Sequence, residues 1–508
     1  MKQLALAAAV VVVLAACGKP SGATDAGLQK LPELKAAPLG TERVWALDHP
    51  LVVERDRPPS NPGQLAYLFD AGYGSVSAAP GLTPAVFTVD GGAPSSSGGT
   101  PVLLARFVHL SDMQLADDES PSRLVGFDNL GDLSGAFRPQ EAWGCQMLNA
   151  AARSINALHR TRPIEFVVSG GDNADNAQRN EVQWFDAVLD GAPQVECDSG
   201  DDDDLRPGQG NDPKDPFVPE GLAMPWKWVT GNHDVLNQGV FQLTADARAS
   251  YVGNQAQFGT RRWAQGEAVP FTGTITADPR REALVRTALM DEVAGSGDGH
   301  GLKAPGATQD GKAFYPVETA LGRVRLVVLD TSIAEGSAEG ILLRDDVENR
   351  VRPMLEKAER DGVYVILVSH HSPQALTDGS NFGGMAQPGA LTTTQWRDFL
   401  GQFPHVVLHL AGHSHEHHTR VARPSTGHAF FESESASIAD WPQQPRLVEI
   451  FEEGAFLHLK LTPFDYAEDD DPLAAEARRR AALDSSTGWA GGNLKESGAV
   501  ELWFPKVP

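Results

Sequence analysis

Five short blocks of residues that suit metal ions occur along the chain, and each follows a short apolar run. Their carboxylates, amides and imidazoles supply the oxygen and nitrogen donors that divalent cations take in proteins. Cations held in this way activate water and stabilise negative charge, which is the chemistry of metal-assisted hydrolysis. In chain order the blocks are Asp112-Met113-Gln114, Gly171-Asp172-Asn173-Ala174-Asp175-Asn176, Gly231-Asn232-His233-Asp234, His370-His371 and Gly412-His413-Ser414-His415.

Spacing within two of the blocks predicts which side chains act together. Asp112 and Gln114 lie two residues apart at a predicted strand end, and His413 and His415 have the same spacing. Because side chains two apart on a strand share a face, each pair can direct its polar atoms to one side. We therefore expect an oxygen of Asp112 and one of Gln114 to reach the same cation.

The block from Gly231 to Asp234 is the most specific of the five. Asn232 offers a carbonyl oxygen to a cation, and His233 beside it is placed to protonate the oxygen of a leaving group. Asp172 follows Gly170 and Gly171, which let the chain turn sharply after a strand.

In this order the blocks resemble the calcineurin-like metallophosphoesterases. The resemblance implies an α/β fold, in which a layered β-sandwich flanked by helices carries a dinuclear metal centre at its strand ends. It implies two divalent cations, drawn from Mn, Fe, Mg and Zn, and a metal-activated water that hydrolyses a phosphoric ester. By the same resemblance the first site takes Asp112, Gln114, Asp172 and His415, and the second takes Asp172, Asn232, His370 and His413.

The resemblance also implies a catalytic pair, and it reveals two positions at which this chain differs from related proteins. His233 would protonate the leaving group and Asp175 would orient it. The family usually has His where this chain has Gln114, and a neutral amide oxygen favours Mn, Mg or Fe over softer ions. Protein Ser/Thr phosphatases have a phosphate-clamping Arg where this chain has Asn176, so a small phosphodiester or phosphomonoester is the favoured substrate.

The sequence leaves two adjacent histidines as candidates for one of the metal ligands. His370 and His371 end an apolar run, so we expect their side chains to point to opposite faces and only one to bind metal. The family pattern favours His370, whereas counting back from Pro373 favours His371.

A second class of function is a non-catalytic metal-binding or partner-binding surface lipoprotein. The Gln114 departure and the large insertions would fit it. An enzyme is favoured because five of the expected functional residues are all present, namely Asp172, Asn232, His233, His413 and His415.

Apolar runs predict the strands that position the blocks, with helical patterns between several of them, which is typical of a layered α/β domain. We expect a closing hairpin from Arg446 to Phe451 and from Phe456 to Leu461. The other predicted strands are Val102 to Leu110, Ile164 to Ser169, Trp226 to Thr230, Val324 to Asp330, Val363 to Ser369 and Val406 to Ala411.

The expected organisation has a single catalytic domain with additions. A mobile acidic loop (198–219) and an insertion that shapes the substrate pocket (239–320) interrupt it, and a peripheral helix near 474–483 follows it. The predicted segments are a signal peptide (1–16), a lipidated leash (17–40), an N-terminal extension of strands and loops (41–100), the metallophosphoesterase domain (101–465) and a C-terminal tail (466–508).

The N-terminus predicts export. Lys2 precedes an apolar segment from Leu4 to Val13, and Leu14-Ala15-Ala16-Cys17 resembles a bacterial lipobox. We expect lipidation at Cys17 and a globular body held at a membrane by the lipid anchor only, facing the periplasm or the cell exterior. A plain secretory signal is the alternative. In that oxidising compartment Cys145 and Cys197 would form a disulfide, unless Cys145 is simply a buried thiol.

The net charge of the chain limits the classes of molecule that it is expected to bind. The chain has 42 Lys and Arg against 67 Asp and Glu, a net charge of −25, which disfavours nucleic acid because phosphate backbones are held chiefly by Lys and Arg. A small anionic phosphoester stays compatible, since two divalent cations dominate their local field. The sequence does not predict an oligomeric state.

Overall fold

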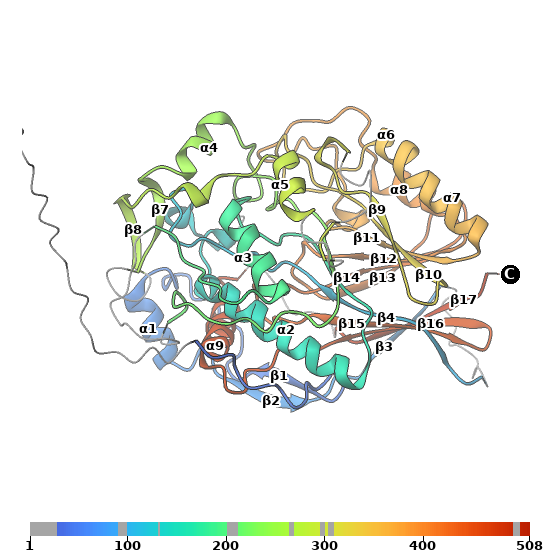
Figure 1. Cartoon of the computed structure of the whole chain (residues 1–508), viewed down its shortest axis with the longest axis horizontal. Helices are drawn as coiled ribbons and strands as arrows, with labels where there is room; N and C mark the ends of the chain where they lie inside the picture. The colour runs from blue at the N-terminus through green and yellow to red at the C-terminus, as the bar shows by residue number, and fades with distance from the viewer. Residues whose placement is uncertain are drawn as a thin grey trace, which may run out of the picture.

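The computed structural model describes residues 28–89, 99–130, 133–200, 212–263, 269–294, 300–302, 309–490 and 498–507. Two β-sheets lie at the centre of the molecule, with helices on their outer sides (Figure 1). The layered α/β fold expected from the sequence is confirmed. The lipobox with Cys17 and the acidic run 201–204 lie outside the described residues.

The larger sheet has seven strands in the order β3-β17-β16-β15-β4-β5-β6. Strands β4, β5 and β6 are parallel to one another, so their carboxyl ends lie at one edge. The strands are β3 (Ala85–Thr88), β17 (Val500–Pro505), β16 (Phe456–Pro463), β15 (Arg446–Glu453), β4 (Val102–Leu110), β5 (Val167–Ser169) and β6 (Trp226–Lys227).

The second sheet has six strands in the order β13-β14-β12-β11-β10-β9. Its four central strands are parallel, and their carboxyl ends also meet. The strands are β13 (His418–Ala422), β14 (Phe430–Glu434), β12 (Val406–Ala411), β11 (Tyr364–Val368), β10 (Val324–Val328) and β9 (Tyr315–Glu318). Two two-stranded antiparallel sheets stand apart, β1 (Arg43–Leu47) with β2 (Val76–Pro80) and β7 (Gln255–Arg262) with β8 (Val269–Thr274).

Apolar side chains fill the space between the sheets and beneath the helices. One cluster joins Phe107 and Leu459 of the larger sheet to Ile366 and Leu408 of the smaller one and to Ile155 of α2. A second lies under α7 and α8, on the far side of the smaller sheet. The helices are α1 (Pro62–Asp70), α2 (Gly144–Thr161), α3 (Arg179–Asp190), α4 (Ala245–Tyr251), α5 (Arg286–Val293), α6 (Arg344–Asp346), α7 (Arg352–Asp361), α8 (Thr393–Leu400) and α9 (Pro472–Thr487), with a π-turn at Val347–Val351 between α6 and α7.

Most predicted strands form where they were expected. β4 and β12 have the predicted bounds, and the closing hairpin is β15 with β16. β6 is shorter than predicted and ends at Lys227. Cys145 and Cys197 form the disulfide, with their Cα atoms 6.5 Å apart.

The C-terminal segment differs from the expectation of a peripheral helix. Ala474, Ala477 and Ala481 of α9 are fully buried, because small residues let the helix pack closely on α2 and on the segment from Glu141 to Trp143. β17 then enters the larger sheet between β3 and β16. The division into domains stays a prediction, although both the extension and the tail contribute strands to this sheet.

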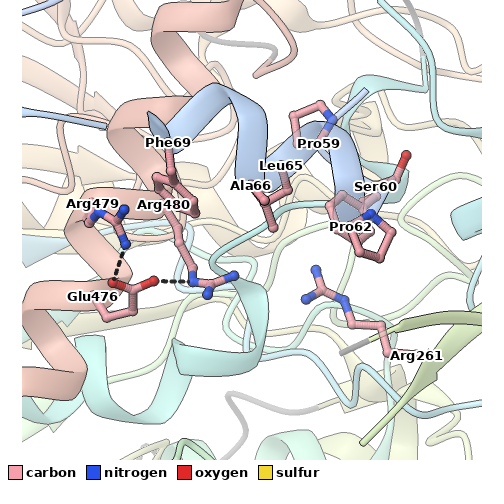
Figure 2. A pocket seen from close by; sticks show the side chains of 11 residues that line it. Pro59, Ser60, Pro62, Leu65, Ala66, Phe69, Arg261, Glu476, Arg479 and Arg480 are labelled. Carbon is pink, nitrogen blue, oxygen red and sulfur yellow. Dashed lines mark hydrogen bonds and ion pairs between the residues drawn. The ribbon is translucent and has the colours of Figure 1, made fainter. Parts of the chain in front are cut away.

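Helix α1 lies across α9, so an early segment of the chain packs on a late one (Figure 2). The Arg479 guanidinium lies 3.7 Å from the centroid of the Phe69 ring, and Glu476 accepts hydrogen bonds from Arg479 and Arg480. These residues line a cavity of about 270 Å³ between the two helices. No helix within the described ranges is both long and apolar enough to cross a membrane.

Candidate metal centre

All five blocks meet at the carboxyl ends of β4, β5, β6, β11 and β12, on loops that hydrogen bond to one another. The Gln114 amide donates to the Asp172 carbonyl at 2.9 Å, and the Gly412 amide donates to the His370 carbonyl at 2.9 Å. Each of these contacts joins two loops of the same sheet, whereas the His413 amide, which donates to Asp112, and the His370 ring, which donates to the Gly170 carbonyl, join the loops of one sheet to those of the other.

The first expected ligand group gathers around Asp112. Its Oδ1 lies 3.3 Å from Nε2 of His415, and both of its oxygens accept from the His413 amide at 3.1 Å. Gln114 is buried, and its Oε1 has no hydrogen-bond donor among the described residues. An oxygen left in this state fits a cation ligand, because a buried polar atom without a partner is costly.

The second expected group gathers around Asp172. Its Oδ2 lies 3.1 Å from Nε2 of His370, whose Nδ1 donates to the Gly170 carbonyl at 2.8 Å, so Nε2 is the ring nitrogen that a cation would take in place of a proton. Asn232 uses its Nδ2 to donate to Gly239, while its buried Oδ1 lacks a donor within the described ranges. Asp112, Asp172 and His370 each offer one ligand atom within 4.8 Å of the others.

His371 has a different surrounding. Its Nδ1 lies 2.9 Å from the Thr331 hydroxyl and its Nε2 lies 2.9 Å from the Ala338 carbonyl, so both ring nitrogens have protein partners. The expectation that His370 and His371 point to opposite faces is wrong, since their ring centroids are only 4.7 Å apart. The two-residue repeat does not reach them because β11 ends at Val368. Both rings lie near His413, and these three histidines form a second possible ligand group.

Five of the seven expected ligands adopt backbone conformations that L-residues rarely take. Such positive φ angles outside glycine concentrate at functional sites, where the surrounding structure compensates for the strain. The φ angles are 53° at Asp112, 42° at Gln114, 51° at Asp172, 71° at His413 and 58° at His415. Gly231 permits a similarly close approach, because a Cβ there would lie 2.0 Å from Oδ1 of Asp172.

Buried charge explains the protonation of the site. Burial lowers the pKa of His370, but the Asp172 carboxylate attracts its proton more strongly and raises that pKa to about 9. Burial likewise lowers the pKa of His415, but the Asp112 carboxylate favours the protonated ring more strongly, and the pKa rises to about 10. The carboxylates therefore require positive charge beside them, which bound cations would supply in place of the protons.

His233 lies against both carboxylate loops. Its amide donates to Oδ1 of Asp172 at 2.8 Å, and its Nδ1 donates to the backbone carbonyl of Asp175 at 2.5 Å. The Asp175 carboxylate is 3.7 Å from the same nitrogen. Asp175 thus holds the ring mainly through its carbonyl, and the ring's Nε2 is left for proton transfer.

Comparison with known proteins identifies the architecture. The family model described as calcineurin-like phosphoesterase matches residues 105–417, which include every expected ligand and the catalytic pair. The chain belongs to this family.

Two solved structures are similar to this phosphoesterase at low identity. A dimetal phosphatase from Danio rerio is 14% identical with a TM-score of 0.39, and the match covers 72% of this chain and all of that one. GAP50, the anchor in the inner membrane complex of Plasmodium, is 13% identical with a TM-score of 0.28, and the match covers 70% of this chain and 85% of that one. No curated protein matches the chain.

Behind the expected ligands, the phosphoesterase has buried partners that the sequence did not indicate. Asp440 accepts from Nδ1 of His415 at 2.6 Å and from Nε of Arg138 at 3.0 Å. Arg123 is fully buried and pairs with Asp175 and Glu141. Asp440 lies beyond the last block and Arg123 between the first two, so no motif marks either residue.

Asp234, the last residue of its block, links its own loop to the loop that carries Asp172. Its Oδ1 accepts from the amides of Asn173 and Ala174, each at 2.9 Å, and its Oδ2 accepts from the Gly231 amide at 2.8 Å. His417, just beyond the last block, is buried, and its Nδ1 accepts from the Ala436 amide at 3.1 Å.

A cavity of about 210 Å³ opens onto the site. Members of both expected ligand groups line this cavity, together with apolar side chains and one arginine. The lining residues with polar side chains are Gln114, Arg138, Asp172, Asn232, His233, Gln238, His413 and His415.

Proposed function

We propose that this phosphoesterase holds two divalent cations and hydrolyses a small phosphodiester or phosphomonoester. The observation that carries the proposal is the pair of buried oxygens, Oε1 of Gln114 and Oδ1 of Asn232, that lack donors beside the Asp112 and Asp172 carboxylates. Neutral oxygens, carboxylates and imidazoles in one buried cluster match the donor set of hard and borderline cations.

The proposed assignment gives each cation four protein ligands. Asp112, Gln114, Asp172 and His415 would hold the first cation. Asp172, Asn232, His370 and His413 would hold the second, so that Asp172 serves both. When bound, the cations supply Lewis acidity and a water of lowered pKa.

The chain's own residues complete the reaction. His233 would protonate the departing oxygen through Nε2, because its Nδ1 is already committed to the Asp175 carbonyl. Asp175, in turn neutralised by Arg123, keeps that ring in place. Asp440 fixes the tautomer of His415 by accepting from its Nδ1.

The environment favours a small substrate. Asn176 donates to Ser122 and accepts from the Gln238 amide and the Tyr251 hydroxyl, so its uncharged side chain holds neighbouring loops together. It cannot replace the phosphate-clamping arginine of protein Ser/Thr phosphatases. This supports a small ester rather than a phosphoprotein.

The experiment is hydrolysis of 4-nitrophenyl phosphate and bis(4-nitrophenyl) phosphate by the metal-loaded protein. We expect turnover of at least one ester that a chelator removes and added Mn²⁺ restores. Metal binding without turnover of either ester would support the non-catalytic lipoprotein instead.

We also propose that the protein is exported and anchored through a lipid on Cys17. The support is the short apolar segment followed by Leu14-Ala15-Ala16-Cys17. Cys17→Ser should move the protein from the membrane fraction to the soluble fraction. An unchanged distribution would contradict lipid anchoring.

A further inference from the structure

A second cavity adjoins the metal-site cavity and is larger, at about 480 Å³. Leu124 and Phe241 line both cavities, so the two spaces are neighbours across these side chains. The second cavity is therefore the space next to the expected ligands beyond Leu124 and Phe241.

The walls of the second cavity come from three segments held by one residue of the metal loops. Ser122, the Gln238 backbone and Tyr251 all hydrogen bond to the Asn176 side chain. They belong respectively to the loop after β4, the loop after the Asn232 block and helix α4. Asn176 directly follows Asp175, so the cavity is tied to the catalytic loop.

The lining chemistry is uncharged and polar. None of the described residues that line the cavity carries a charge, although 21% of the chain is charged. Asn237 lines the cavity, and its buried Oδ1 has no donor in the described part of the chain. The polar lining residues are Ser122, Asn237, Ser250, Asn254, Gln255 and Gln257.

Aromatic rings add a flat, apolar surface. Phe241 and Phe258 line the cavity, and Phe258 is half exposed and lies 5.5 Å from Phe127. Rings presented in this way stack on flat ligands or on the apolar faces of sugars.

These features exclude several alcohol portions. A polyanionic group would need Lys or Arg, and neither lines the cavity among the described residues. A cationic group would find no carboxylate among them and would interact only with the two Phe rings. A lipid chain would leave the amides and hydroxyls without partners.

We propose that this cavity, the polar subsite, binds the alcohol portion of the substrate, and that this portion is an uncharged ring bearing hydrogen-bond donors and acceptors. A nucleoside and a sugar both have this chemistry. The inference rests on the proposed function, because it assigns a place for the ester of that same reaction.

The test compares esters that differ only in the group offered to the polar subsite. Each is prepared as a monoester and as its 4-nitrophenyl diester, with thymidine, glucose, choline or methanol as the alcohol. We expect kcat/KM for the thymidine or the glucose ester to exceed that for the choline and methyl esters at least tenfold. The better of the two rings identifies the source of the ligand.

Two variants remove hydrogen bonding while keeping side-chain size, Asn254→Leu and Gln257→Met. Each should lower kcat/KM for the preferred ring ester about tenfold, the usual effect of one hydrogen bond, and leave the methyl ester within about twofold. Gln194→Met is the matched control, because Gln194 is an exposed amide on the loop after α3 that does not line the subsite.

The outcomes separate the two proposals. Turnover of all four alcohols at similar rates, or equal losses on ring and methyl esters in both variants, would overturn the polar subsite and leave the proposed function standing. No turnover of any ester, including 4-nitrophenyl phosphate, would overturn the proposed function itself.

Discussion

Single residues at the site are arranged to receive positive charge. Oε1 of Gln114 and Oδ1 of Asn232 are buried and have no donors of their own among the described residues, and both residues line the same cavity as Asp172, His413 and His415. Gln114 is the residue at which this chain departs from its family, and its position beside Asp172 agrees with a ligand role.

The departure at Gln114 can be tested directly. Gln114→His would replace a neutral oxygen with an imidazole nitrogen, a better donor for borderline metals, so zinc affinity at the first site should rise. Competition titration with a zinc indicator measures the change. An unchanged titration would mean that residue 114 does not bind metal.

The role of His233 as a general acid can be tested with esters whose leaving groups differ in how much they need protonation. His233→Ala should lower turnover of alkyl esters about 10²- to 10⁴-fold, the usual contribution of a general acid. Nitrophenyl esters should lose less, because nitrophenolate leaves without much protonation.

Metal content is the control for that variant and should stay near the wild-type level, since Asn232 rather than His233 is the expected ligand. Equal losses on both kinds of ester, with metal retained, would remove His233 from the acid role. Loss of metal would make it a ligand or a structural residue.

The blocks could be found from the sequence because each ligand follows a strand and lies beside other ligands. Asp440 and Arg123 could not, because each acts alone, and the partners His415 and Asp175 lie 25 and 52 residues away. His371 shows the same limit, since its partners Thr331 and Ala338 come from another loop.

Among the elements, the strand ends position the chemistry and the longer connections enclose it. The disulfide joins the first turn of α2 to the loop after α3, across 52 residues of chain. That loop also contacts the site's surroundings, because Ser199 donates to Asp117, which pairs with Arg281.

The disulfide should stabilise the fold. Replacing Cys145 and Cys197 by Ser should lower the free energy of unfolding by about 2–4 kcal/mol. Urea unfolding with and without a reducing agent measures this. If the reductant destabilises the double variant as much as the wild type, the effect does not come from this bridge.

Strands with a local apolar signal were predictable, whereas β17 was not. Its pairing with β3 joins residues about 400 positions apart, which no local pattern can reveal. α9 was predicted as a helix, but its burial depends on α2 and α1, which no pattern within α9 can reveal.

Across the whole molecule, an acidic chain buries a number of its carboxyl groups. Burial and repulsion by Asp440 and Asp128 raise the pKa of Asp484 in α9 well above its usual value. Burial and Glu141 raise the pKa of Asp128 to about 8. Both groups are therefore neutral in the folded protein at moderately acidic pH.

This burial predicts a dependence of stability on pH. Because folding raises the pKa values of Asp484 and Asp128, their contribution to stability is fully present below about pH 4, falls as pH rises above that value, and for Asp128 is lost as pH passes about 8. Unfolding in urea with a chelator present should show lower stability at pH 9 than at pH 5. Asp484→Asn should reduce that difference by about 1–3 kcal/mol, the cost of a buried group left without a partner. A difference unchanged in the variant would mean that Asp484 is ionised in the folded state at both pH values.

The central claim is that Asp172 joins two cations in a hydrolytic centre. The most direct measurement is the metal content of the purified wild type and of Asp172→Ala, taken together with hydrolysis of a nitrophenyl phosphoester. We predict two cations per chain and metal-dependent turnover in the wild type, and loss of both in the variant, because the shared carboxylate balances the charge of both cations. Equal metal loading in the two proteins would contradict the account.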